Sequence, residues 1–123
     1  GRAAAGDVVQ ISYVAGGARY GAIFSIDGAG VVTWHLPSAV GPETESPALQ
    51  SGGEVPLGFA YELDDAPGFE RFLFVTSARP FALEPLRGEA ERLASDPATA
   101  RGGGLRLGKG PAAASFLLVK EAR

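Results

Sequence analysis

The sequence contains one histidine, which is the first candidate for catalytic chemistry. His35 has no His-x-Glu or His-x-x-x-His partner around it, so metal binding built on imidazole is not predicted. Ser25 stands two positions before Asp27 but lacks the Gly-x-Ser-x-Gly elbow of a hydrolase nucleophile. Because Ser25 and His35 flank one turn, they can be cross-strand neighbours, and a hydroxyl-to-imidazole distance of about 3 Å beside a pocket would support a small hydrolase-like domain. From the sequence we expect a surface or loop-adjacent histidine and no catalytic residue.

Residues 62–70 place four carboxylates around one turn, which is the second candidate site. Oxygen ligands on a loop suit calcium, and paired carboxylates can share a proton. The spacing matches no EF-hand loop, however, and Asp-Asp-x-Pro-Gly is typical of an ordinary turn. Glu70 precedes Arg71, which indicates a surface ion pair of small energy. We predict a structural turn and no metal, with a calcium site in the Glu62–Glu70 turn as the alternative.

Glycine-rich segments raise the question of phosphate binding, and their context argues against it. Gly102-Gly103-Gly104 is not predicted to open a helix, and Gly108-Lys109-Gly110 is followed by Pro111 where a P-loop needs Ser or Thr. Gly28-Ala29-Gly30 precedes a predicted strand, so no helix N-terminus is available there to hold an anion. We therefore predict no nucleotide site and no cofactor.

Composition narrows the function classes further. The 14 acidic and 11 basic residues give a net charge of −3, which provides no electrostatic basis for binding nucleic acid. The absence of cysteine excludes disulfides, zinc–thiolate sites, iron–sulfur clusters and thiol catalysis. No run of 18 apolar residues is present, so no membrane span is predicted. The length of 123 residues indicates a single domain, 1–123, and the lack of any methionine leads us to expect a domain taken from a longer chain.

Short alternating segments separated by glycine-rich turns predict a mainly β fold. Three of them, joined by short turns, are expected to form an antiparallel meander. Phe72–Val75 is apolar at every position, which is typical of a strand covered on both faces. The six predicted strands are Val8–Val14, Tyr20–Ile26, Val31–Leu36, Leu57–Leu63, Phe69–Ser77 and Ser115–Lys120.

One helix is predicted over residues 85–95, with a single apolar stripe and Asp96-Pro97 as its stop. The resulting fold class is α+β, mainly β: a small antiparallel β-sandwich of about six strands with one helix. Residues 37–56 and 101–114 are expected to be long loops. The aromatic side chains expected inside are Tyr13, Phe24, Trp34, Phe59, Tyr61, Phe72 and Phe74.

Several segments together form a connected pattern of strand and turn residues. They are Gly6-Asp7-Val8-Val9-Gln10-Ile11-Ser12-Tyr13, Tyr20–Gly28, Val31–Pro37, Ala60–Phe72 and Phe74–Ser77. Across roughly residues 6–95, the pattern resembles the uncharacterised C-terminal domain of bacterial membrane-anchored anti-sigma-factor-like proteins and related envelope domains of unknown function.

In proteins of that kind, an N-terminal zinc finger holds a sigma factor, one helix crosses the membrane, and the C-terminal domain lies outside. The resemblance implies a sensory or protein-interaction module on the extracytoplasmic (periplasmic) side. This sequence has neither the zinc-finger residues nor the membrane helix, so the sigma-binding role is carried onto no residue here.

The sequence therefore favours a non-enzymatic interaction module. We expect its partner to be a protein or peptide, or the rest of its own chain, rather than a small ligand, because no convergent polar set is visible to orient one. The expected contact is one of the long loops, 37–56 or 101–114, or a strand added along an open sheet edge.

Overall fold

The computed structural model describes residues 1–66 and 68–121, which contain seven strands and two helices. In chain order these are β1 (Arg2–Ala4), β2 (Val8–Val14), β3 (Tyr20–Asp27), β4 (Val32–Leu36), β5 (Glu54–Glu62), β6 (Gly68–Ser77), α1 (Leu83–Ala94), α2 (Pro97–Gly102) and β7 (Ala112–Glu121). The predicted mainly β, α+β class is confirmed. Within the described residues, no helix is long and apolar enough to cross a membrane.

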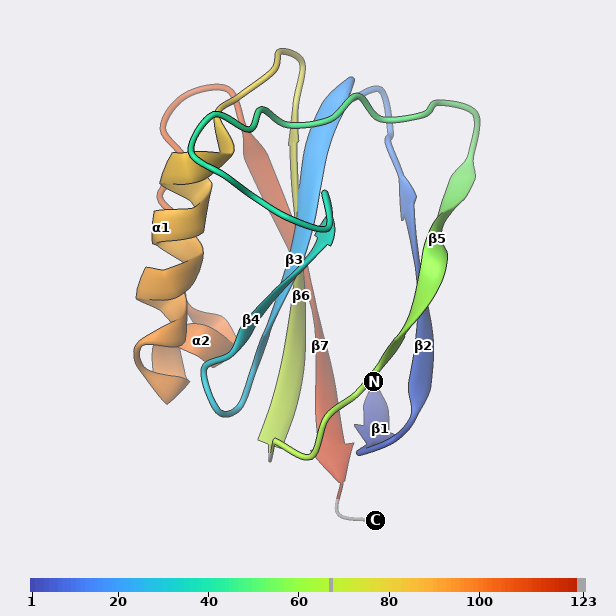
Figure 1. The fold of residues 1–123 in the computed structure, drawn as a ribbon, viewed down its shortest axis with the longest axis vertical. Helices are drawn as coiled ribbons and strands as arrows, with labels where there is room; N and C mark the ends of the chain where they lie inside the picture. Colours follow the sequence, from blue (N-terminus) through green and yellow to red (C-terminus); the bar gives the residue numbers. More distant parts are fainter. Residues whose placement is uncertain (67, 122–123) are drawn as a thin grey trace.

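The strands form two sheets that pack in a sandwich-like way. The larger sheet has the order β1-β7-β6-β3-β4, and the smaller one contains β2 and β5. Both helices cover one face of the larger sheet, and the β2–β5 sheet covers the other (Figure 1). Strand pairing is antiparallel except between β1 and β7. The molecule therefore has three layers, with the larger sheet in the middle.

The helix-covered face holds an apolar core. The buried stripe of α1 packs against alternate residues of β3 and β6, including Phe24, Leu73 and Val75. The predicted helix is confirmed and begins two residues earlier than expected, at Leu83. The expectation that β6 is covered on both faces is confirmed as well, because helix residues pack on one face of it and residues of β2 and β5 pack on the other.

The predicted meander is wrong. β3 and β4 form the expected hairpin, but β2 pairs with β5, far along the chain, and not with β3. The Gly16-Gly17 turn, with φ values of 61° and 91°, carries the chain from the smaller sheet to the larger one. Alternation predicts a strand but not its partner, so the pairing depended on contacts that the local pattern does not contain.

Two further differences concern the chain ends and the long loops. β1 was not predicted, and β7 begins at Ala112, inside the predicted loop 101–114. β5 likewise begins at Glu54, inside the predicted loop 37–56. The prediction of a single helix is wrong, because Asp96-Pro97 is more than the stop of the first helix. The pair also starts α2: the Asp96 side chain accepts from the Thr99 N–H, and proline fills the first helical turn.

Most of the aromatic prediction is confirmed. Six of the seven side chains named above are buried or half-buried, and the exception is Phe59, which is 45% exposed. Phe59 alternates in phase with Leu57 and Tyr61, but β5 belongs to a sheet with only two strands, so it is an edge strand. Such a strand leaves part of its apolar surface in water.

Candidate functional site

The face of the larger sheet that meets the β2–β5 sheet carries a cluster of buried polar residues. Ser25 and Asp27 of β3, His35 of β4 and Glu70 of β6 are each no more than 2% exposed. They alternate along their strands with the apolar residues that face the helices, because successive strand residues point to opposite faces. Buried polar groups of this kind need partners, and the cluster supplies them internally.

Ser25 and His35 are cross-strand neighbours, with Ser25 Oγ 2.8 Å from His35 Nε2. The strand pairing has a bulge at this point: Ile23 pairs with Leu36 and Phe24 with Trp34, so His35 is the extra residue. The His35 ring packs edge-on against Tyr61, at a centroid distance of 4.6 Å. The predicted surface position of His35 is therefore wrong, because His35 lies on the same face of the sheet as Ser25 and Tyr61 of β5 covers that face.

The Ser25–His35 distance is the one that would support a hydrolase, but the surroundings argue against that chemistry. Burial lowers the pKa of His35 to about 4, so the imidazole is a weak base. The Glu70 carboxyl hydrogen-bonds Ser25, whereas in a catalytic triad the carboxylate orients the histidine. Ser25 itself is 0% exposed, so a substrate cannot reach its hydroxyl. The pair serves as a buried hydrogen bond.

The acidic turn joins the same cluster through two of its four carboxylates. Single oxygen atoms of Asp27, Asp64 and Glu70 lie within 4.8 Å of one another. The Lys120 ammonium lies 2.8 Å from Asp64 Oδ1 and 3.1 Å from Glu70 Oε1, and its side chain is 3% exposed. Lys120 therefore supplies the positive charge that a cation would bring. Motif spacing does not point to Lys120, because it lies on the last strand, far from the acidic turn in the sequence.

The predicted surface pair of Glu70 and Arg71 is wrong. The two residues are adjacent in β6, so their side chains point to opposite faces of the sheet. Glu70 faces Lys120, while Arg71 lies on the helix side and donates to the backbone oxygens of Ala100 (3.3 Å) and Gly103 (2.7 Å). Each charge is buried with its own partners.

Burial and pairing shift the pKa values across the cluster. Burial, together with the hydrogen bond to Asp64, raises the pKa of Asp27. Burial also raises the pKa of Glu70, although Ser25 and Lys120 oppose it. Desolvation acts to raise the pKa of Asp64, but hydrogen bonds from Lys120 and Asp27 outweigh it and lower that pKa. Within the hydrogen-bonded pair of Asp27 and Asp64, Asp27 is thus the carboxyl that holds the proton, and it can donate it to Asp64.

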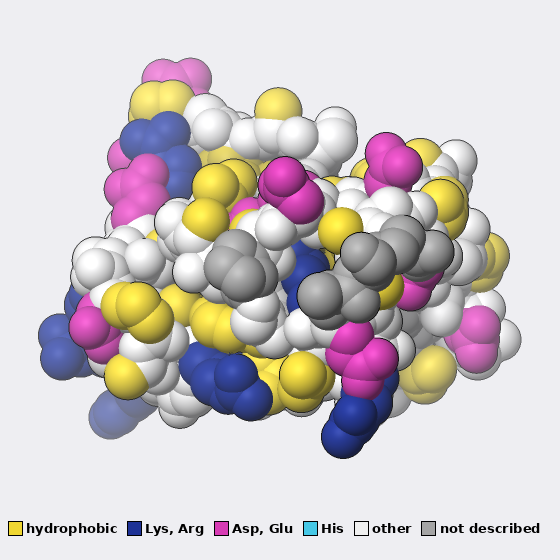
Figure 2. Space-filling model, turned by 90° about the horizontal axis from the view of Figure 1, so that it is seen from below, with side chains coloured by type: hydrophobic (Ala, Val, Ile, Leu, Met, Phe, Trp, Pro, Cys, Tyr) yellow, Lys and Arg dark blue, Asp and Glu magenta, His cyan; other side chains and the backbone are white. Residues whose placement is uncertain are grey.

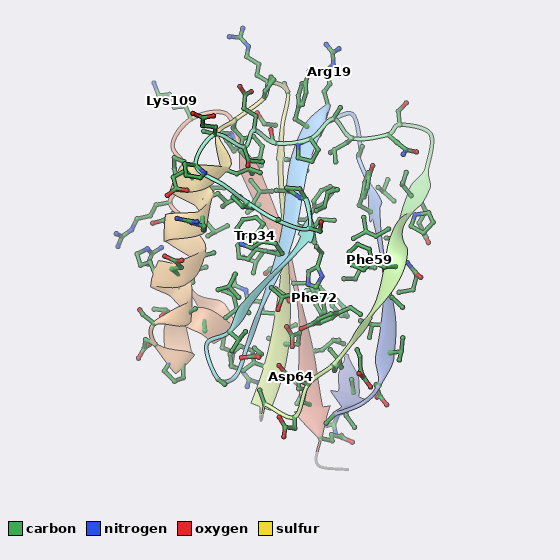
Figure 3. The ribbon with its side chains drawn as sticks, viewed as in Figure 1. Arg19, Trp34, Phe59, Asp64, Phe72 and Lys109 are labelled. Atoms are coloured by element: carbon green, nitrogen blue, oxygen red, sulfur yellow. The ribbon has the colours of Figure 1, made fainter. Side chains whose placement is uncertain are left out.

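These groups connect the two sheets at one end of the molecule. Figure 3 shows Asp64 at the lower end of the view and Phe72 between the sheets. Tyr61 of β5 donates to Glu70 Oε2 at 3.4 Å, which links the smaller sheet to the larger. Figure 2, a view onto this end, shows acidic and basic side chains interspersed and no continuous acidic patch. The cluster links the two sheets inside the molecule and contributes little charged surface.

The other half of the same interface contains an open apolar groove of about 460 Å³ between β2 and β7. Phe116, at 56% exposure, is its most exposed aromatic residue. Among the described residues, none that lines the groove is charged. The lining residues are Val9, Gln10, Ile11, Ser12, Tyr13, Ile23, Phe72, Leu73, Phe74, Ala114, Ser115, Phe116 and Leu118.

The two predicted long loops are held in place by specific bonds. In the first, the Gln50 N–H donates to Tyr13 Oη at 2.9 Å, and Ser46 Oγ accepts from the Phe81 N–H at 2.9 Å. In the second, Glu89 Oε1 accepts from the Arg106 N–H at 2.6 Å. Both loops are therefore tied to the body of the domain.

No protein-family model, curated protein or solved structure matches the chain. The resemblance to envelope domains of anti-sigma-factor-like proteins stays a prediction. The polar cluster, the groove and the surfaces around them are the features of the molecule that bear on its function.

Proposed function

We propose that this domain is a non-enzymatic protein-interaction module that binds a segment of a partner protein in the groove between β2 and β7. The observation that carries the proposal is an apolar groove of about 460 Å³ left open at the side of the sandwich, with Phe116 half in water. Exposed apolar surface in a concave site is where soluble domains commonly bind partners.

The chemistry of the lining favours a protein segment over a small ligand or an ion. The groove offers apolar side chains and strand edges but, within the described chain, no charged side chain to orient a small polar molecule. The charged groups nearby are sealed in the polar cluster, where Lys120 and Glu70 already neutralise each other. The loops 37–56 and 101–114 are weaker candidates for the binding surface than the groove. Their hydrogen bonds to the body of the domain leave them less free to adapt to a partner.

The biological setting of the proposal comes from the resemblance. It makes the domain a sensory or interaction part of a bacterial envelope regulatory protein of the anti-sigma-factor-like kind, on the extracytoplasmic side. A partner segment in that setting would belong to another envelope protein.

The test is selection of binders from a displayed random library of seven-residue peptides. We expect selected peptides to bind the native chain and to lose at least tenfold in affinity for Phe116→Ser. Phe59→Ser is the matched control, because Phe59 is also an exposed aromatic residue but does not line the groove. Failure to recover any binder, or equal losses for the two variants, would overturn the proposal.

A further inference from the structure

We propose that the partner segment binds as an added β-strand, running parallel to β7 along the unpaired part of its outer edge. This inference rests on the proposed function and specifies how the segment is held. It commits to an extended peptide segment of another protein whose groove-facing side chains are apolar and uncharged.

The outer edge of β7 is paired at one end only. On its inner side β7 pairs with β6 from Ala112 to Lys120. On its outer side β1 covers only Val119–Glu121. The part of β7 from Ala112 to Leu118 has no strand in register beside it among the described residues. Such an edge presents backbone donors and acceptors to any extended chain that reaches it.

The hydrogen bonds at the β1 end show which backbone groups face outward. The Val119 N–H donates to the Gly1 oxygen at 2.8 Å, and the Gly1 nitrogen donates to the Leu117 oxygen at 3.3 Å. Because strand residues alternate in direction, the N–H and C=O groups of Ala113 and Ser115 point to the same outer side. The Leu117 N–H does too.

These bonds also define the orientation and register of an added strand. Gly1 bridges Leu117 and Val119, which is the pattern of a parallel ladder. Repeating the pattern places one residue of the new strand across Ser115 and Leu117, and a second across Ala113 and Ser115. The added strand thus continues an interface that β1 already makes.

The position of Gly1 shows which side chains of the added strand would enter the groove. A Cβ atom on Gly1 would lie 3.1 Å from Leu118 Cδ2 and 3.3 Å from Phe116 Cζ, two residues that line the groove. The two bridging residues of the added strand share the phase of Gly1, so their side chains point the same way. We expect apolar residues at these two positions, two apart in the peptide, and no charge at either, since no lining residue can pair with one.

A second copy of this chain is a weaker occupant. Two copies related by a two-fold axis would join their β7 edges antiparallel, whereas the pairing present at this edge is parallel. A concentration-dependent dimer in analytical ultracentrifugation that is abolished by Ser115→Pro would overturn the assignment of a partner segment.

The experiment uses peptides recovered from the library and measures their affinity for the complete chain by fluorescence anisotropy. Ser115→Pro removes the outward N–H without removing a bond to β6, and proline is tolerated on an edge of this kind. Ser115→Ala is the matched control, because it keeps the N–H. We expect at least a tenfold loss of affinity for Ser115→Pro and no change for Ser115→Ala.

Peptides with N-methylated amides keep the inference testable if Ser115→Pro disturbs the fold. N-methylation at the two bridging residues should abolish binding to the native chain, since their N–H groups donate to the edge. N-methylation at the residue between them should be tolerated, because its N–H points away from β7. Equal effects at all three positions would overturn strand addition.

The outcomes separate this inference from the proposed function. Binding that is lost with Phe116→Ser but is insensitive both to Ser115→Pro and to N-methylation retains the groove and overturns strand addition. Binding that is insensitive to Phe116→Ser as well overturns both.

Discussion

The two faces of the central sheet are formed by alternate residues of the same strands, and they differ in chemistry and in closure. Toward the helices, β3 and β6 present residues such as Phe24, Leu73 and Val75, each no more than 1% exposed. Toward the β2–β5 sheet, the intervening positions hold Ser25 and Glu70, together with the floor of the open groove. One face is sealed and apolar, and the other is part polar and part open.

The difference follows from what covers each face. α1 lays a continuous apolar stripe on one side, and Trp34 on β4 packs against the same core (Figure 3). A sheet of only two strands cannot cover five, so it leaves the β7 side open. Where the two sheets do meet, a hydrogen-bonded network replaces part of the apolar packing. Such a network defines one arrangement of the sheets but depends on every member being paired.

The largest effect should come from removing the ammonium of the network. Lys120→Met leaves the buried Glu70 carboxylate without its cation, and we expect a loss of about 3–5 kcal/mol in unfolding free energy near neutral pH. The pKa of Glu70 is already raised by burial, and the loss of Lys120 raises the folded pKa values of Glu70 and Asp64 further, so the folded variant binds more protons than the native chain and the loss shrinks on acidification. Urea unfolding at several pH values measures this.

Leu73→Ala on the opposite face is the control for Lys120→Met. Leu73 is 1% exposed in the apolar core, and its truncation should cost about 2–5 kcal/mol by leaving a cavity. That loss should be the same at each pH, since no titrating group loses a partner. A pH-independent loss for Lys120→Met would contradict the role given to the ion pair.

His35 should make the domain sensitive to acid. Its folded pKa of about 4 lies below the ordinary histidine value of 6.5, so the unfolded state binds more protons between the two values. The stability contributed by neutral His35 is fully present above the unfolded pKa of 6.5 and is lost as the pH falls to the folded pKa of about 4. The total loss in unfolding free energy is about 3 kcal/mol. Asp27 and Glu70 have raised pKa values and act in the opposite direction.

The His35→Gln variant isolates this contribution. Glutamine can still hydrogen-bond Ser25 but does not titrate. We expect the variant to resist acid better than the native chain, so the stability difference between the two proteins should change by about 3 kcal/mol between neutral pH and about pH 4. An unchanged stability difference between the two proteins at the two pH values would show that His35 has the same pKa in the folded and unfolded states.

The contrast between the faces also shows what the sequence could predict. The strands, the main helix and the double coverage of Phe72–Val75 follow from local periodicity, which reports how a residue alternates between environments. The pairing of β2 with β5 and the bulge at His35 are not local properties. Lys120 and Asp64 are 56 residues apart in the sequence, and they meet only because β7 lies beside β6. The Ser25–His35 contact could thus be predicted from the hairpin, whereas the contacts of Lys120 with the carboxylates were beyond the reach of motif spacing.

Arg71, a charged residue buried on the helix side, should give the next smaller effect. Arg71 donates to the backbone oxygens of Ala100 in α2 and of Gly103 directly after it, and Arg71→Met should cost about 2 kcal/mol by leaving those oxygens without the charged donor. Hydrogen exchange should increase in α2 and stay unchanged in β2 and β5. Arg101→Met is the control, since Arg101 only rests over the Phe69 ring at 5.7 Å and its loss should cost less than about 1 kcal/mol.

The groove should tolerate substitution that the sealed core does not. Phe116→Ser and Phe59→Ser remove side chains that are 56% and 45% exposed, and each should change the unfolding free energy by less than about 1 kcal/mol. Thermal unfolding measures both. A loss for Phe116→Ser as large as that for Leu73→Ala would mean that the ring supports the fold, which would weaken its use as a probe of binding.

Calcium should have the smallest effect, since none is expected. Three carboxylates within 4.8 Å of one another resemble a calcium site, but the Lys120 ammonium lies 2.8 Å and 3.1 Å from two of them, and a metal would have to displace it. Millimolar calcium should therefore leave the melting temperature of the native chain unchanged. In Lys120→Met the same carboxylates lose their cation, so calcium should stabilise that variant by binding its folded state. Stabilisation of the native chain by several degrees would show instead that the polar end of the interface accepts a metal in place of its lysine.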